Sequence, residues 1–124
     1  MRKSLRVLVV FGRRNEDGKA FASFFLGKGH TAVLTQGGEC ALLTLRDNGS
    51  FDVVVIDARL FYKAGMRLID VLLNVNPFQQ YVLIAADASV TYRLIENRNY
   101  PDRNVLAHPF MPEVLLSRVL ELCL

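Results

Sequence analysis

One carboxylate in this chain has a setting in which it could do chemistry. Asp57 directly follows residues 53–56, which read Val-Val-Val-Ile, four β-branched residues in a row. An unbroken run of this kind is typical of a strand buried on both faces at the centre of a parallel sheet. Open α/β sheets carry their sites at the carboxyl ends of the strands, so Asp57 is placed where a site would lie. The alternative is an aspartate that only caps a turn.

The elements that must position Asp57 alternate five times along the chain. Strand patterns occupy residues 5–11, 31–35, 53–56, 81–86 and 105–107, and helix patterns occupy 19–28, 39–46, 65–75, 89–97 and 112–124. This alternation with short loops predicts an α/β fold, a parallel sheet with helices on both faces. In the first helix we expect Ala20, Phe21, Phe24 and Phe25 to face the sheet. Asn15 or Asp17 is expected to cap its start, and Gly29 to cap its end in a left-handed conformation.

Composition excludes several classes of protein. The 124 residues, 52% of them hydrophobic, predict one folded domain spanning residues 1–124 rather than a disordered chain. The net charge of +3 is mild and the basic residues are scattered, so we expect no nucleic-acid partner. No apolar run approaches the ~18 residues of a membrane span. Cys40 and Cys123 lack metal-ligand spacing and are predicted to be free, half-buried thiols of a cytoplasmic protein.

Several short motifs follow one another in an order that resembles the receiver domain of bacterial two-component response regulators. Phe51-Asp52 leads into the third strand, Asp57 ends it, and Gly65 stands where that family has the glycine of its Met-Asp-Gly turn. Further matches are Gly38-Glu39, Ala41-Leu42, His108-Pro109-Phe110 in place of Lys-Pro-Phe, and Pro112-Glu113. The resemblance covers nearly the whole chain. It implies a doubly wound, flavodoxin-like sheet of strand order 2-1-3-4-5 with five helices, and a cis His108–Pro109 bond.

The residues that such domains use for phosphorylation are mostly replaced in this chain. Phe11 and Gly12 occupy the positions of the acidic pair that holds magnesium, an ion that takes oxygen ligands. Ala85 replaces a hydroxyl residue and has no donor, and His108 replaces a lysine. Val105 stands at the position of the switch aromatic. Asp57 alone remains, so we expect no metal site, no cofactor and no enzymatic activity.

Charged residues near the expected pocket have two interpretations each. Arg13, Arg14 and Asp87 are predicted to be solvated surface charges. Arg59, two residues after Asp57, could fold back and pair with it, because an arginine fork suits a carboxylate. His108 is expected either to be a buried, hydrogen-bonded residue that holds the corner before Pro109, or to pair with Asp57.

Three functions remain open at this point. The first is a pseudo-receiver that signals by binding a protein partner or by dimerising, through the family's usual face of fourth helix, fifth strand and fifth helix. A histidine kinase or an output domain is the partner that the resemblance implies. The second is a phosphorylatable receiver with Asp57 as nucleophile. The third is a flavodoxin-like binder of small molecules, against which the absence of a glycine-rich loop after the first strand counts.

Overall fold

The computed structural model describes residues 4–12, 16–58, 60, 67–97 and 100–123. The strands within these ranges form one parallel sheet. Its strands are β1 (Arg6–Phe11), β2 (Thr31–Gln36), β3 (Val53–Asp57), β4 (Tyr81–Ala85) and β5 (Val105–Ala107). All four strand pairs are parallel, and the order across the sheet is β2-β1-β3-β4-β5. The predicted fold class and strand order are therefore confirmed.

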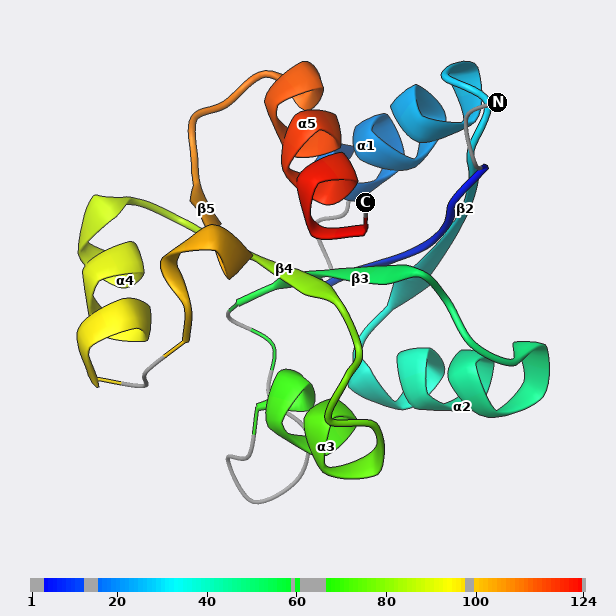
Figure 1. Cartoon of the computed structure of the whole chain (residues 1–124), viewed down its shortest axis with the longest axis horizontal. Helices are drawn as coiled ribbons and strands as arrows, with labels where there is room; N and C mark the ends of the chain where they lie inside the picture. The colour runs from blue at the N-terminus through cyan, green and yellow to red at the C-terminus, as the bar shows by residue number, and fades with distance from the viewer. Residues whose placement is uncertain (1–3, 13–15, 59, 61–66, 98–99, 124) are drawn as a thin grey trace.

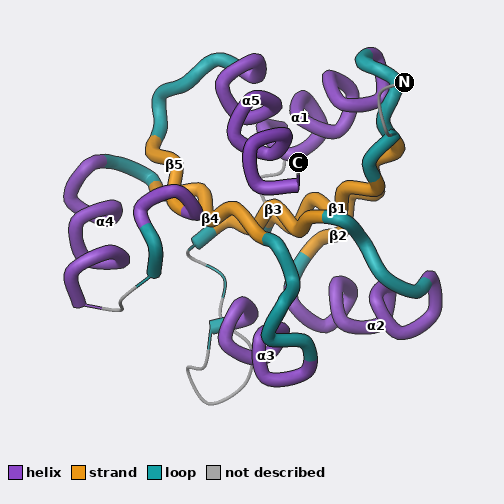
Figure 2. The backbone as a smooth tube through the Cα atoms, in the orientation of Figure 1, coloured by secondary structure: helices purple, strands orange, loops and turns teal. Residues whose placement is uncertain are grey.

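Helices cover both faces of the sheet. They are α1 (Glu16–Gly27), α2 (Gly38–Asn48), α3 (Leu68–Val75), α4 (Ala88–Tyr92) and α5 (Pro112–Cys123), with a π-helical turn η1 (Arg93–Asn97) after α4 and a short 3-10 turn η2 (Asp102–Asn104) before β5. In Figure 1, α1 and α5 lie on one face of the sheet and α2 and α3 on the other. Figure 2 shows α4 beyond the β5 edge. The helix predicted over residues 89–97 is present, but its second half is π-helical.

The central strand is buried along its whole length and contributes to two separate cores. Val53 and Val55 lie in the core beneath α1 and α5, whereas Val54 and Ile56 lie in the core beneath α2 and α3. All four of these side chains are 2% exposed or less. This confirms the central position of the strand, because alternate residues of a strand point to opposite faces.

The buried stripe of α1 differs from the predicted one. Ala20 is exposed and Phe24 is only half-buried, and the residues that face the sheet are Gly18, Phe21, Ala22 and Phe25. These four follow the i, i+3, i+4, i+7 spacing of one helix face, so the prediction is confirmed for Phe21 and Phe25 and wrong for Ala20 and Phe24. A side-chain carbon at Gly18 would lie 3.0 Å from Leu34 and 3.1 Å from the Phe11 ring, so the glycine lets α1 lie close to the sheet.

The end of α1 is set by Gly29, as predicted. Its φ of 87° is in the left-handed region that glycine adopts without strain. Its N–H donates to Leu26 O at 3.2 Å, and the N–H of His30 donates to Phe25 O at 3.1 Å. This pair of bonds is the Schellman arrangement, which satisfies the last carbonyl groups of the helix.

Arg6 joins the start of β1 to the end of α2. Its Nη1 donates to Ser50 O at 2.6 Å and its Nη2 to Asn48 O at 3.0 Å. The guanidinium carbon lies 4.8 Å from the centre of the Phe51 ring. The N–H of Arg6 donates to Asp52 Oδ2 at 2.8 Å, which gives the Phe51-Asp52 motif a structural role. These contacts fix the amino-terminal end of β3 against β1.

Two further predictions concern the cysteines and α3. Within the described residues neither Cys40 nor Cys123 forms a disulfide, and Cys123 is half-buried as predicted, whereas Cys40 is exposed. α3 lies within the predicted helix range 65–75, with Ile69 and Leu72 buried and Leu73 packed against the same core. The predicted start of this helix at Gly65 lies outside the described residues.

Candidate functional site

Asp57 is the last residue of β3 and only 6% exposed. It is in register with Ile84 of β4, and the next residue, Ala58, donates its N–H to Ile84 O at 3.0 Å. The carboxylate therefore lies at the carboxyl end of the central strand, as predicted. This is the edge of the sheet where a parallel α/β fold places its site.

An aromatic side chain, Phe11, lies at the end of β1, where the resemblance predicts the first residue of the replaced acidic pair. Phe11 is 3% exposed, and its ring centre lies 5.9 Å from that of Phe21. Phe21 stacks on Phe110 at 5.4 Å, and Phe110 stacks on His108 at 4.9 Å. We call these four rings the aromatic row. The row links β1, α1 and the loop after β5 through apolar contact, and its phenyl rings offer no oxygen ligand.

Gly12, where the resemblance predicts the second residue of that pair, lies beside an apolar neighbour. A side-chain carbon at Gly12 would lie 3.6 Å from Leu60 Cδ2, which is ordinary van der Waals contact. Leu60 itself is half-buried and packs against the core beneath α2 and α3. Gly12 is thus bordered by a hydrocarbon side chain from the loop after β3.

Ala85 and Asp87 follow one another closely at the end of β4 and have different roles. Ala85 is 0% exposed, and its carbonyl accepts a hydrogen bond from the N–H of His108 at 3.0 Å. Asp87 is exposed, as predicted, and also caps α4, because its Oδ1 accepts from the N–H of Val90 at 2.9 Å. Neither side chain places a hydroxyl group at the carboxyl end of β4.

The prediction that His108 is buried is wrong, because its side chain is 32% exposed. Its Nε2 lies 3.9 Å from Asp17 Oδ2, and the predicted pairing with Asp57 stays a prediction. The ring stacks on Phe110, and the His108–Pro109 bond is cis, as predicted. Asp17 was expected to cap α1 but lies inside its first turn. There its negative charge interacts favourably with the positive end of the helix dipole. The pairing is long-range in sequence, so no local spacing pointed to it.

One residue near Asp57 was missed by the sequence analysis. Arg67 lies just before α3, and its Nη1 donates to Ala58 O at 2.8 Å. The bond ties the segment that follows Asp57 to the start of α3. The only signal in the sequence was a basic residue after the third strand, and most basic residues in such loops are simply solvated. Arg13, Arg14 and Arg59 lie outside the described residues, so their predicted roles stay predictions.

The titratable side chains of the described ranges do not cluster in a way that suggests a metal centre. Among residues 4–12, 16–58, 60, 67–97 and 100–123, no three His, Cys, Asp or Glu side chains are grouped so that they could hold a metal ion. Within the same ranges, every helix is too short or too polar to cross a membrane.

Several solved structures with the same architecture are receiver domains of response regulators. The receiver domain of the Francisella response regulator 1452 is 23% identical to this chain, with a TM-score of 0.79 over 97% of both chains. The chain has the receiver fold. Chemotaxis response regulator CheY4 of Vibrio cholerae is 19% identical, with a TM-score of 0.77 over 97% of this chain and 99% of that one.

A longer protein also contains this receiver fold. NtrX from Brucella abortus is 17% identical, with a TM-score of 0.80, and the match covers 98% of this chain but 27% of NtrX. No model of a known protein family matches the chain, and no curated protein matches it either.

Proposed function

We propose that this chain is a receiver-type regulatory domain that acts by protein contact and without magnesium-dependent phosphorylation of Asp57. The observation that carries the proposal is Phe11. It occupies the position of a metal-binding carboxylate, it is 3% exposed, and it packs into the aromatic row. A metal ion could bind at this place only if the phenyl ring left the core, which would break the packing between β1 and α1.

The chemistry of phosphoryl transfer supports this proposal. The transition state spreads negative charge over the equatorial oxygens, and catalysis consists mainly of positioning and of positive charge that meets them. Phe11 and Gly12 offer no side-chain oxygen, Ala85 offers no hydroxyl, and the His108 ring is directed to Asp17. Loss of one preorganised donor typically lowers a rate by ~10²–10³. Such losses are not additive, but three together should bring the rate near background.

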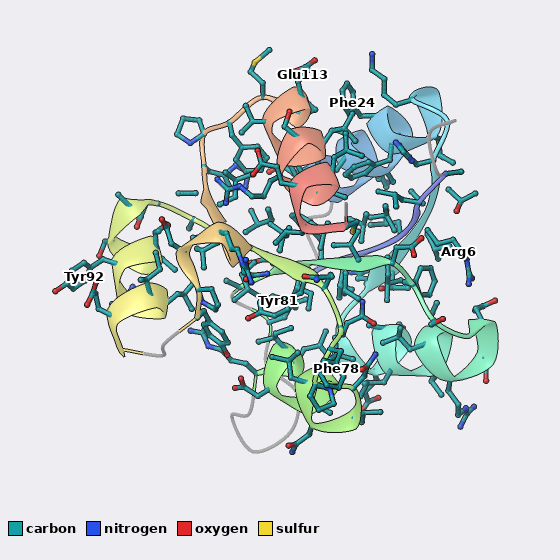
Figure 3. All side chains as sticks on the ribbon, viewed as in Figure 1. Arg6, Phe24, Phe78, Tyr81, Tyr92 and Glu113 are labelled. Atoms are coloured by element: carbon teal, nitrogen blue, oxygen red, sulfur yellow. The ribbon has the colours of Figure 1, made fainter. Side chains whose placement is uncertain are left out.

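The surface formed by α4, β5 and α5 is the proposed contact face for a partner. Three large apolar side chains are exposed on its helices and on the loop before α5: Tyr92 at 65%, Met111 at 64% and Val114 at 43%. Figure 3 shows Tyr92 at the outer side of α4. Exposed side chains of this size offer apolar surface that a protein partner could cover. A protein partner, such as a kinase or an output domain, is the proposed occupant, and a cytoplasmic location follows from that role.

A phosphorylatable receiver is the second candidate, and one observation favours it. Asp57 retains the position of the phosphoacceptor at the carboxyl end of β3, where it is buried but not sealed, with 6% of its surface exposed. In this alternative a donor other than the replaced residues would have to meet the charge of the phosphoryl group.

Isothermal titration with magnesium, alone and with beryllofluoride, separates these two candidates. We expect no saturable heat that depends on Asp57, because a single carboxylate holds magnesium weakly. Asp57→Asn removes that carboxylate, and Asp87→Asn is the matched control, because asparagine preserves the helix cap. Saturable heat that disappears in Asp57→Asn but persists in Asp87→Asn would contradict the proposal and favour phosphorylation.

A further inference from the structure

The outer side of α2 carries an apolar stripe flanked by opposite charges. Glu39, Leu42, Leu43 and Arg46 line a shallow depression of about 300 Å³. Leu43 is 48% exposed and the Arg46 side chain is 72% exposed. We call these four residues the α2 stripe. None of them belongs to the site at Asp57 or to the proposed contact face on α4, β5 and α5.

A second hollow continues the stripe towards α3. This groove has a volume of about 460 Å³, and its apolar lining comes from Leu42 and Leu45 of α2 and from Leu72 and Val75 of α3. Of these lining residues Val75 is 80% exposed, and Phe78, in the turn that follows α3, is 90% exposed. Figure 3 shows Phe78 at the turn after α3, on the side of the molecule that α2 and α3 share. The apolar surface is therefore larger than the stripe alone, which is unusual for a solvated face.

Helix geometry places the four residues of the stripe on one line. They are spaced i, i+3, i+4 and i+7, so at 100° per residue all of them fall within one side of α2. Glu39 and Arg46 are two turns apart, about 10 Å along the axis. The midpoint between them lies between Leu42 and Leu43, so the charges are arranged symmetrically about the apolar pair.

This symmetry is the kind that fits a second copy of the same chain as the partner. A two-fold axis through the midpoint would bring a second α2 antiparallel to the first. Glu39 of each copy would then face Arg46 of the other, and the leucines would meet at the centre. A closed dimer needs a self-complementary patch of this kind, in which each residue meets its counterpart across the axis. A partner surface that carries charges of only one sign would instead place a like charge against one end of the stripe.

We propose that α2 is the interface of a homodimer in which two copies of the stripe pack antiparallel. The leucines and the groove provide the buried apolar area, and the charges set the orientation, because exposed ion pairs by themselves add little affinity. The Arg46 Nε already contacts Asp47 Oδ1 at 3.1 Å, but a guanidinium has further N–H donors for a second carboxylate. The dimer leaves α4, β5 and α5 open, so this inference does not depend on the proposed function.

Charge reversal tests the proposal on the full chain by sedimentation velocity over a concentration series. Glu39→Arg and Arg46→Glu should each weaken dimerisation by about tenfold or more, because each makes both cross-axis pairs repulsive. An equimolar mixture of the two variants should dimerise again, since one copy then carries two arginines and the other two glutamates. The double variant Glu39→Arg/Arg46→Glu should also recover, because its stripe is again self-complementary.

Three controls separate this interface from general stickiness and from misfolding. Leu43→Gln should weaken the dimer, whereas Lys19→Glu, a reversal on the exposed side of α1, should leave it unchanged. Circular dichroism should show that every variant melts cooperatively. A wild-type chain that stays monomeric throughout the series would overturn the proposal. A dimer that tolerates both single reversals, or single variants that fail to recover on mixing, would overturn it as well.

Discussion

Phe11→Ala is the substitution that measures most directly how much the aromatic row contributes to the core. The ring is 3% exposed and contacts Phe21, and it also lies against Gly18 of α1. Truncation of a buried phenylalanine typically lowers the free energy of unfolding by about 3–5 kcal/mol. Domains of this size are stable by about 5–15 kcal/mol, so the variant should fold but should lose a large share of its stability.

The assay is urea unfolding of dilute protein, followed by far-ultraviolet circular dichroism. Phe78→Ala is the matched control, because it makes the same chemical change at a side chain that is 90% exposed. We expect that control to stay within about 0.5 kcal/mol of wild type. If the two variants lost similar stability at equal m-values, the Phe11 ring would not be part of a packed core. The proposal that Phe11 packs where a metal-binding carboxylate would otherwise lie would then have no structural basis.

Three other substitutions follow from the fold and the contacts. Val55→Asp should abolish folding, because it places an unpaired charge at a residue that is 0% exposed. A soluble variant that melts cooperatively would contradict the assignment of β3 as the central strand. Arg6→Lys keeps the positive charge but loses the guanidinium that donates to two carbonyl groups at once. Urea unfolding should show a free energy of unfolding lower by about 1 kcal/mol. An unchanged unfolding midpoint would refute the stabilising role of Arg6. Burial, reinforced by the Asp70 carboxylate and opposed by Arg103, raises the pKa of Tyr81 above 10.0. Its contribution to stability is therefore complete below that pH and is lost as the pH rises through the folded-state value, so Tyr81→Phe should lose less stability between about pH 8 and about pH 11 than wild type does.

The sheet and the place of Asp57 could be predicted because they depend on local signals. The run of β-branched residues from Val53 marks the central strand, and the alternation of strand and helix patterns fixes the parallel topology. The left-handed Gly29 was predictable for the same reason, since a helix end has a local chemistry.

The side-chain arrangement around the site could not be predicted in the same way. His108 is directed to Asp17, which lies far away in the sequence and meets it only after α1 and α5 pack on the same face. Arg67 likewise finds the carbonyl of Ala58 through the fold rather than through a motif. The buried stripe of α1 was predicted only in part, because Ala20 is apolar but exposed and Phe24 is apolar but only half-buried, so hydrophobicity alone did not fix the helix face.

The central claim is that Asp57 does not act as a phosphoacceptor, and intact-mass spectrometry tests it most directly. The chain is incubated with acetyl phosphate and magnesium at neutral pH, beside an active receiver domain as a positive control and Asp57→Asn as a negative control. We predict that the active receiver gains the mass of one phosphoryl group while this chain and its variant both stay unmodified. An adduct that forms on this chain within minutes and is absent from Asp57→Asn would contradict the account.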